Sequence, residues 1–321
     1  MNRQMKDMFL FEDDEIYAEA KRRIEECRKK KSKKLDLSRL DLKKIPPEIA
    51  ELRFLEELDI TCHSLKKIPG FIGNIVSLKK LLVGSHSSSA HEREKTILPA
   101  GLGNLRNLKS LSLGYTIPKI PRWVYKLDNL EALTICSDSA ESIPAEIADM
   151  KKLRKLRIYG KKITELPKEI GEKLSLTLLV LDCPQLKTLP DSFANFKTMK
   201  AFLFYQSKLQ AIPDYICGWT NLEETEINMS CDFQGLSAKF HAVPRNIGNL
   251  KKLKYLNLGG VNTAKIPDSL GNCPLEHLEL YGNFSILPKT LGNCSKLKTI
   301  KFLSGKPIIL PDSFGKLSAL R

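Results

Sequence analysis

The sequence lacks the features that mark membrane-spanning and secreted proteins. Its 321 residues contain no apolar run of roughly 18 residues, so no transmembrane helix is predicted. The first residues are charged, with an acidic run from Glu12 to Glu15, and offer neither the apolar segment nor the small-residue cleavage site of a signal peptide. We therefore expect a cytoplasmic protein.

Paired cysteines and aromatic residues are also scarce. The eight cysteines are widely spaced and form no C-x-x-C pair, although zinc sites and disulfide frameworks need closer pairs. We expect reduced thiols that fill small core positions. Aromatic residues make up only 7% of the chain, which predicts a thin core of aliphatic layers built from leucine and isoleucine.

Catalytic and cofactor motifs are missing as well. The chain contains no G-x-x-x-x-G-K-[ST], G-x-S-x-G or H-E-x-x-H sequence. His86 and His91 share a segment with two glutamates, which we interpret as a solvated loop and not as a metal site. Cys136 and Cys183 are expected on outward strand positions, with no base assigned to either. The sequence thus predicts a protein without catalytic residues, metal or cofactor, and not an enzyme.

A repeat is what the sequence does contain. The frame Leu153, Leu156, Ile158, Ile163 and Leu166-Pro167 recurs along the chain, and such self-similarity is the primary sign of a solenoid. Intervals between repeat starts run from 22 to 31 residues. The twelve starts are Ser32, Leu55, Leu78, Leu108, Leu130, Leu153, Leu176, Met199, Leu222, Leu253, Leu275 and Leu297.

The repeated pattern L-x-x-L-x-L…L-x-x-[IL]-P-x-x-[IL]-G-N-L resembles the leucine-rich-repeat family along about nine-tenths of the chain. The form at Ile247-Gly248-Asn249-Leu250 is similar to the 23-residue class of intracellular bacterial and plant proteins. The resemblance implies an α/β repeat solenoid over residues 32–321. This leucine-rich-repeat horseshoe would carry a parallel β-sheet on its concave face and helical or 3₁₀ turns on its convex face.

The physics of each repeat agrees with that expectation. The L-x-L alternation places neighbouring side chains on opposite faces of a short strand. The following proline ends the strand and presets a helical turn. Each repeat buries its apolar edge only against its neighbours.

Residues 1–31 are predicted to form an N-terminal tail and a capping helix. Within 12–31, the apolar residues Ile16, Ala20, Ile24 and Cys27 recur at helical spacing. The acidic residues precede this face and the basic residues follow it, which is the order that the helix dipole favours. The join into the first repeat resembles bacterial leucine-rich-repeat proteins, some of which continue into a GTPase module.

Two departures from the family pattern are visible. The ninth repeat position, usually asparagine, conforms only at Asn283, so irregular turns are expected. Two repeats carry extra residues, within 87–96 and 231–242. Both insertions follow a predicted strand, so we expect them to protrude from one rim and to add selectivity for a partner.

The net charge of +15 suggests a polyanion partner, but its distribution does not. The segment from Lys21 to Lys34 alone carries nine bases and two acids, or +7. Outward strand positions carry six bases and seven acids, about −1 in total. Binding of nucleic acid or membrane is therefore not predicted for the sheet, and remains an alternative for the basic cap.

Apolar and aromatic residues at outward strand positions indicate a protein interface. Leucine and valine on the open side of a sheet make an apolar patch, and tyrosine is a frequent interface anchor. We predict a protein–protein interaction scaffold with another protein as partner; the alternative is a regulatory domain of a larger signalling protein such as one containing a GTPase. The predicted partner-binding residues are Tyr115, Lys155, Arg157, Tyr159, Leu178, Val180, Leu203, Tyr205, Tyr255 and Tyr281.

Overall fold

The computed structural model describes residues 3–38, 40–62, 64–85, 95–209, 211–228, 243–262 and 265–321. It forms two compact units, residues 1–140 and 141–321, which we call unit 1 and unit 2. The predicted boundary between residues 31 and 32 lies within unit 1, where the first helix joins the first strand.

Helix α1 (Arg3–Lys30) is longer than the predicted cap. Because it begins nine residues before Glu12, the acidic run lies inside the helix, and the first turn contains no acidic residue. The prediction that acidic residues begin the helix is therefore wrong, whereas the prediction that basic residues end it is confirmed. Ala20, Ile24 and Cys27 are buried, as predicted. No helix among the described residues is long and apolar enough to cross a membrane.

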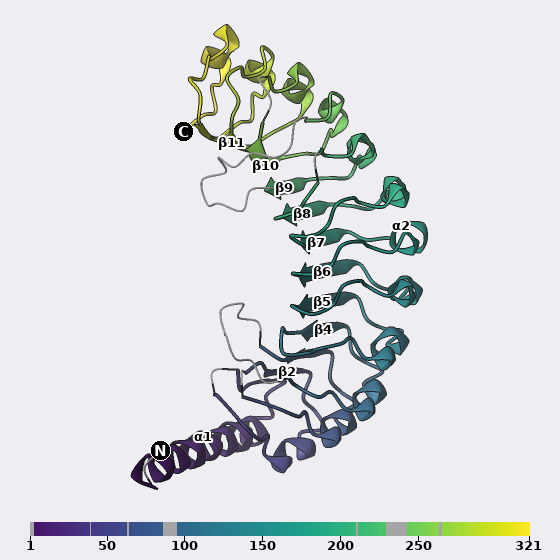
Figure 1. Cartoon of the computed structure of the whole chain (residues 1–321), viewed down its shortest axis with the longest axis vertical. Helices are drawn as coiled ribbons and strands as arrows, with labels where there is room; N and C mark the ends of the chain where they lie inside the picture. Colours follow the sequence, from purple (N-terminus) through teal and green to yellow (C-terminus); the bar gives the residue numbers. More distant parts are fainter. Residues whose placement is uncertain are drawn as a thin grey trace. The chain divides into compact units, whose positions relative to one another are not determined.

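Every strand begins at the third position of a predicted repeat. The strands are parallel and neighbour one another in chain order within each unit (Figure 1). Unit 1 contains β1 (Lys34–Asp36), β2 (Glu57–Ile60), β3 (Lys80–Val83), β4 (Ser110–Leu113) and β5 (Ala132–Ser137). Unit 2 contains β6 (Lys155–Gly160), β7 (Leu178–Asp182), β8 (Ala201–Tyr205), β9 (Glu224–Asn228), β10 (Tyr255–Val261), β11 (His277–Gly282) and β12 (Thr299–Ser304).

Short helices return the chain to the next strand, as the proline pattern predicts. Proline directly precedes most of them, and its fixed φ suits the entry into a helical turn. The single short α-helix among these returns is α2 (Glu169–Lys173), and the other described returns are 3₁₀ helices. They are η1 (Pro47–Glu51), η2 (Gly70–Asn74), η3 (Ala100–Asn104), η4 (Arg122–Lys126), η5 (Ala145–Asp149), η6 (Asp191–Asn195), η7 (Asp214–Gly218), η8 (Ile247–Asn249), η9 (Asp268–Asn272), η10 (Leu291–Asn293) and η11 (Asp312–Lys316).

The core of unit 2 departs from the purely aliphatic layers predicted. Phe193, Phe196, Phe202 and Trp219 are fully buried between successive repeats. The rings of Phe193 and Phe196 lie 4.8 Å apart, and those of Phe202 and Trp219 meet edge to face at 5.2 Å. Because these four aromatic residues lie close together, the low aromatic content of the whole chain conceals their cluster.

Other side chains take the place of the missing asparagines in the turns. In unit 1, Thr116 occupies a ninth position and its hydroxyl accepts a hydrogen bond from the backbone N–H of Ser85 at 3.1 Å. The hydroxyl of Thr96 lies 2.9 Å from that of Thr116 and donates to the carbonyl of Leu65. In unit 2, Gln206 adopts the left-handed conformation with φ 41°, which confirms a locally irregular turn.

Two glycines test how tightly successive 3₁₀ helices stack. A Cβ on Gly248 would lie 2.2 Å from the carbonyl oxygen of Ser269 in the next repeat, whereas one on Gly218 would meet nothing within 4 Å. We expect Gly248→Ala to lower the free energy of unfolding by about 1–3 kcal/mol. Gly218→Ala should leave it unchanged or raise it by about 0.5 kcal/mol. Urea titrations of both variants measure this difference, and equal stabilities would contradict the stacking argument.

Candidate protein interface

The parallel register of unit 2 aligns equivalent positions of successive repeats into rows. Side chains at the third, fifth and seventh positions face away from the core, and we call this surface the open face. The first row contains Lys155, Leu178, Ala201, Glu224, Tyr255, His277 and Thr299. The second contains Arg157, Val180, Leu203, Glu226, Asn257, Glu279 and Lys301, and the third Tyr159, Asp182, Tyr205, Asn228, Gly259, Tyr281 and Leu303.

The strands β6 to β8 carry the apolar part of the open face. Leu178, Leu203, Tyr159 and Tyr205 are all partly exposed there. Val180, which we expect to be accessible, is only 5% exposed. It lies between Arg157 and Leu203 in its row, and a short β-branched side chain among longer neighbours is covered by them. The expected accessibility of Val180 is therefore wrong for the free chain, and its contact with a partner stays a prediction.

The strands β8 to β11 carry a second group, which we call the acidic–aromatic cluster. It consists of Tyr205, Glu226, Asn257, Glu279 and Tyr281. The hydroxyl of Tyr205 donates to Glu226 at 2.9 Å, and that of Tyr281 donates to Glu279 at 3.0 Å. The amide nitrogen of Asn257 lies 3.3 Å from an oxygen of each carboxylate. Two carboxylates are thus held side by side by one amide and two hydroxyls.

Lysine and histidine side chains flank this cluster. Lys301, on β12, places its Nζ 2.9 Å from the second oxygen of Glu279. In the first row, the Nδ1 atom of His277 lies 2.7 Å from the hydroxyl of Thr299. The His277 ring lies 6.3 Å from that of Tyr255. The polar network therefore extends from β8 to β12.

The tyrosines of the cluster act as neutral hydrogen-bond donors. Burial, reinforced by the hydrogen bond to Glu279, raises the pKa of Tyr281 to about 12. Burial and the adjacent Glu226 carboxylate also raise the pKa of Tyr205. Burial raises the pKa of Asp182, which lies between Tyr159 and Tyr205 in the third row. Proximity to carboxylates and loss of solvent both favour the protonated phenol.

The repeat architecture is shared with solved structures. A leucine-rich-repeat protein of Leptospira interrogans is 23% identical, with a TM-score of 0.62, and the match covers 89% of this chain and 82% of that one. An internalin of Listeria monocytogenes is 19% identical, with a TM-score of 0.67 and coverage of 90% and 85%. A plant peptide hormone receptor in complex with RGF2 is 26% identical, with a TM-score of 0.54 and coverage of 84% and 47%.

Residues 30–142 match the family described as leucine-rich repeat region. This chain has the leucine-rich-repeat fold. The predicted fold class is thereby confirmed by the likeness of the fold across both units, and the sequence match in the first repeats agrees with the predicted repeat family. No curated protein matches the sequence.

The leucine-rich repeats place the predicted site residues on different units. Tyr115 belongs to unit 1, whereas the other nine belong to unit 2 and lie on its open face. Tyr281 is a member of the acidic–aromatic cluster and Tyr255 lies beside it on β10, so neither belongs to the apolar strands. The insertion 231–242, and all of 87–96 except its last two residues, lie outside the described residues.

The charges of this leucine-rich-repeat sheet nearly cancel in total, but the acidic and basic side chains lie on different strands. The total of about −1 averages bases on β6 with acids on β9 and β11. Position five of four successive repeats reads Glu226, Asn257, Glu279 and Lys301, which the repeat register alone aligns in one row. The cluster is identified when charge is assigned to each row and strand, and not when the charges of the whole sheet are added.

The cysteines of the repeats lie in the core. Cys136 and Cys183 are 4% and 0% exposed, so the prediction that they face outward is wrong. Burial raises the pKa of Cys183 to about 12, which disfavours the reactive thiolate. All seven cysteines that the structure describes are free and buried, as expected. No group of three or more metal-binding side chains occurs among the described residues.

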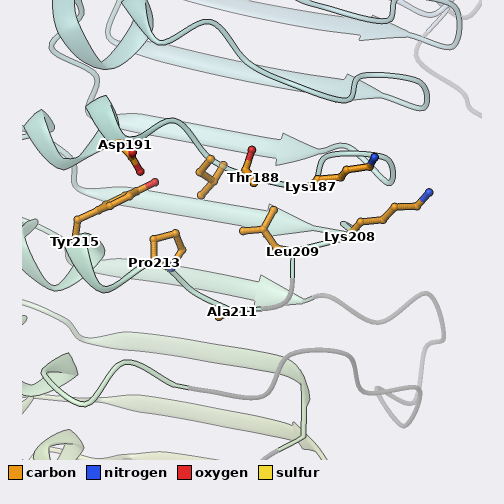
Figure 2. A pocket seen from close by; sticks show the side chains of 9 residues that line it. Lys187, Thr188, Asp191, Lys208, Leu209, Ala211, Pro213 and Tyr215 are labelled. Atoms are coloured by element: carbon orange, nitrogen blue, oxygen red, sulfur yellow. The ribbon is translucent and has the colours of Figure 1, made fainter.

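A hollow of about 650 Å³ lies between the return segments that follow β7 and β8. Figure 2 shows Lys187 and Lys208 at one end and Asp191 beside Tyr215 at the other. The hydroxyl of Tyr215 donates to the carbonyl of Pro190 at 3.2 Å, so it supports the repeat stacking. None of the residues that line this hollow belongs to the open face, and we assign the hollow no ligand.

Proposed function

We propose that this chain is a protein-binding scaffold that takes its partner on the open face of unit 2. The observation that carries the proposal is the pair of partly exposed leucines, Leu178 and Leu203, beside Tyr159 and Tyr205. Apolar side chains on an exposed sheet favour association, because covering them removes apolar area from water. Tyrosine adds a large contact area at low entropic cost.

Two further observations support this function. The plant peptide hormone receptor, whose repeats resemble those of this chain, was solved in complex with RGF2. The open face also combines apolar, acidic and basic side chains in separate regions, which gives it the means to discriminate among partners. We further propose that the chain acts in the cytoplasm, without a cofactor, and that insertions 87–96 and 231–242 add selectivity.

The polyanion alternative has weaker support. Eight of the nine bases between Lys21 and Lys34 form ion pairs with glutamates of α1 or of the first two repeats. Arg28, for example, contacts Glu25 and Glu51. A phosphate group would have to compete with these carboxylates. The alternative of a regulatory domain in a larger signalling protein rests on the resemblance at the first repeat.

The proposed function is tested with a double variant on the open face. Proteins captured by the full chain from source cells are identified, produced separately and titrated against the wild type and Leu203→Asp/Tyr205→Ala. We expect the double variant to bind about 30-fold more weakly or worse, because the loss of even one interface anchor costs about 2 kcal/mol. Both side chains are partly exposed, so the variant should keep the wild-type circular dichroism spectrum.

Val76→Asp provides the matched control. Val76 is 54% exposed in unit 1, next to η2, so this variant also places an aspartate on an exposed apolar position. We expect it to keep the wild-type affinity within about twofold. A folded Leu203→Asp/Tyr205→Ala variant that binds every identified partner with full affinity would refute the proposed function.

A further inference from the structure

The acidic–aromatic cluster has more hydrogen-bond acceptors than donors. An ionised carboxylate accepts about four hydrogen bonds. Among the described residues, Glu226 accepts two, from Tyr205 and Asn257. Glu279 accepts three, from Asn257, Tyr281 and Lys301. The cluster therefore has acceptor positions left for additional N–H donors.

Asn257 gives a second and independent indication of a ligand. Its side chain is only 7% exposed, although it stands on the open face. Its nitrogen donates to both carboxylates, but its buried Oδ1 has no hydrogen-bond partner. An acceptor left without a donor in this way destabilises the free protein. A ligand that displaces the side chains covering this atom and donates to it would remove that penalty.

The charge and the aromatic rings point to a cation. Glu226 and Glu279 together carry −2, and Lys301 returns +1, so the cluster is negative. Glu224, exposed in the first row next to Tyr255, adds a further negative charge. Tyrosine rings attract a cation placed over their faces. No described group of three metal-binding side chains occurs here, so a metal ion is not the favoured cation.

We propose that the acidic–aromatic cluster receives an arginine side chain of the partner polypeptide. The inference rests on the proposed function, because Leu178 and Leu203 would contact apolar residues of the same partner segment. A guanidinium group supplies five N–H donors and has no acceptor, which complements a site with surplus acceptors. Its planar fork can bond to a carboxylate through two nitrogens. A lysine ammonium group has three donors and fits less completely.

Basic side chains lie on either side of the cluster. Lys155 and Arg157, on β6, lie three and five strands from the two carboxylates of the cluster, or roughly 14–24 Å at the usual strand spacing. They repel a second basic side chain and favour an acidic one. On the other side, the side chain of Lys301 is 65% exposed and occupies one oxygen of Glu279 in the free protein. The incoming arginine competes with Lys301 for that carboxylate.

A peptide selection on the full chain tests the proposal. Twelve-residue peptides that bind the wild-type chain are selected from a random display library. Soluble Leu203→Asp/Tyr205→Ala protein is added as a competitor, and the peptides that stay bound to the wild type, and so depend on these two residues, are synthesised. Each is made with arginine and with citrulline, which has nearly the same shape but no charge. We expect citrulline to weaken binding to the wild type by about tenfold or more, the range of charge-assisted hydrogen bonds.

Variants of the cluster complete the test. Glu226→Gln/Glu279→Gln should weaken the arginine peptide by the same factor, and citrulline should then cost nothing further. Lys301→Met should tighten binding several-fold. Glu223→Gln/Glu276→Gln is the matched control, since it removes two charges that lie just before β9 and β11, outside the three rows. It should leave the affinity within about twofold.

The outcomes separate this inference from the proposed function. Peptides that need Leu203 and Tyr205 but lack basic residues, or that bind the Glu226→Gln/Glu279→Gln variant equally well, overturn the arginine site and leave the scaffold function intact. Failure to obtain any peptide that depends on Leu203 and Tyr205, together with full partner affinity of that double variant, overturns both.

Discussion

Replacing Trp219 with alanine should lower the free energy of unfolding of unit 2 by about 3–5 kcal/mol. Trp219 is fully buried and contacts the rings of Phe196, Phe202 and Tyr215, which come from two successive repeats. Its Nε1 atom also donates to the carbonyl of Phe193 at 2.9 Å. The substitution removes the largest side chain of this layer and leaves that carbonyl with one donor, the backbone N–H of Phe196.

The position of Trp219 explains why the effect should spread beyond one repeat. In a solenoid each repeat is stabilised mainly by its neighbours, so a cavity at one interface weakens both sides of it. We expect amide hydrogen exchange to accelerate most in β7 and β8 and least in β12. Because the chain has only two tryptophans, Trp123 in the Trp219→Ala variant becomes a fluorescence probe of unit 1 alone.

Trp219→Phe distinguishes packing from the hydrogen bond. Phenylalanine keeps most of the aromatic volume but loses the indole N–H, so we expect it to cost about 1–2 kcal/mol. Urea titration monitored by circular dichroism measures both variants. A loss below about 1 kcal/mol in Trp219→Ala would show that the aromatic cluster is not the stabilising centre of unit 2.

Alkaline pH should destabilise unit 2 strongly, beginning near pH 9. Burial raises the pKa of Cys183 and Cys273 from 9.0 to about 12, and that of Cys217 and Cys294 to about 11. In the unfolded chain these thiols ionise above their ordinary pKa, whereas in the folded chain they stay protonated. The unfolded state then binds fewer protons than the folded state, so stability falls as the pH rises.

The expected size of this effect follows from the four thiols. Each contributes up to about 1.4 kcal/mol for every pH unit between its unfolded and folded pKa. The stability of unit 2 should therefore decrease by several kcal/mol between pH 9 and pH 10.5, with the loss complete only above the folded values. Urea titrations across this pH range, with a reductant present, measure the slope.

A triple variant provides the control for the alkaline effect. Cys217→Ala/Cys273→Ala/Cys294→Ala removes three of the four titrating groups and keeps small apolar side chains in the core. It should be less stable than the wild type near pH 8, because each substitution leaves a small cavity, but its pH slope should be much shallower. A slope equal to that of the wild type would exclude the buried thiols as its cause.

The strands could be predicted from the sequence, but the length of α1 and the burial of Val180 could not. The twelve repeat starts predict all the strands, because the L-x-L alternation and the proline are local signals with a fixed spacing. The length of α1 was not predicted, since the residues before Glu12 lack a clear apolar period and the acidic run resembles a helix start. Val180 is buried by side chains on the two adjacent strands, and the sequence of its own strand does not show which residues those are.

The sequence by itself determined the repeat class, the position of every strand and the parallel sheet, since these depend on spacing within about 23 residues. Only the tertiary structure decided which charged and aromatic side chains meet. Glu226, Asn257 and Glu279 are separated by 22 or 31 residues in the chain, and their hydrogen bonds depend on the register between strands. Stacking converts a regular sequence period into lateral contacts, and the chemistry of the open face arises from those contacts.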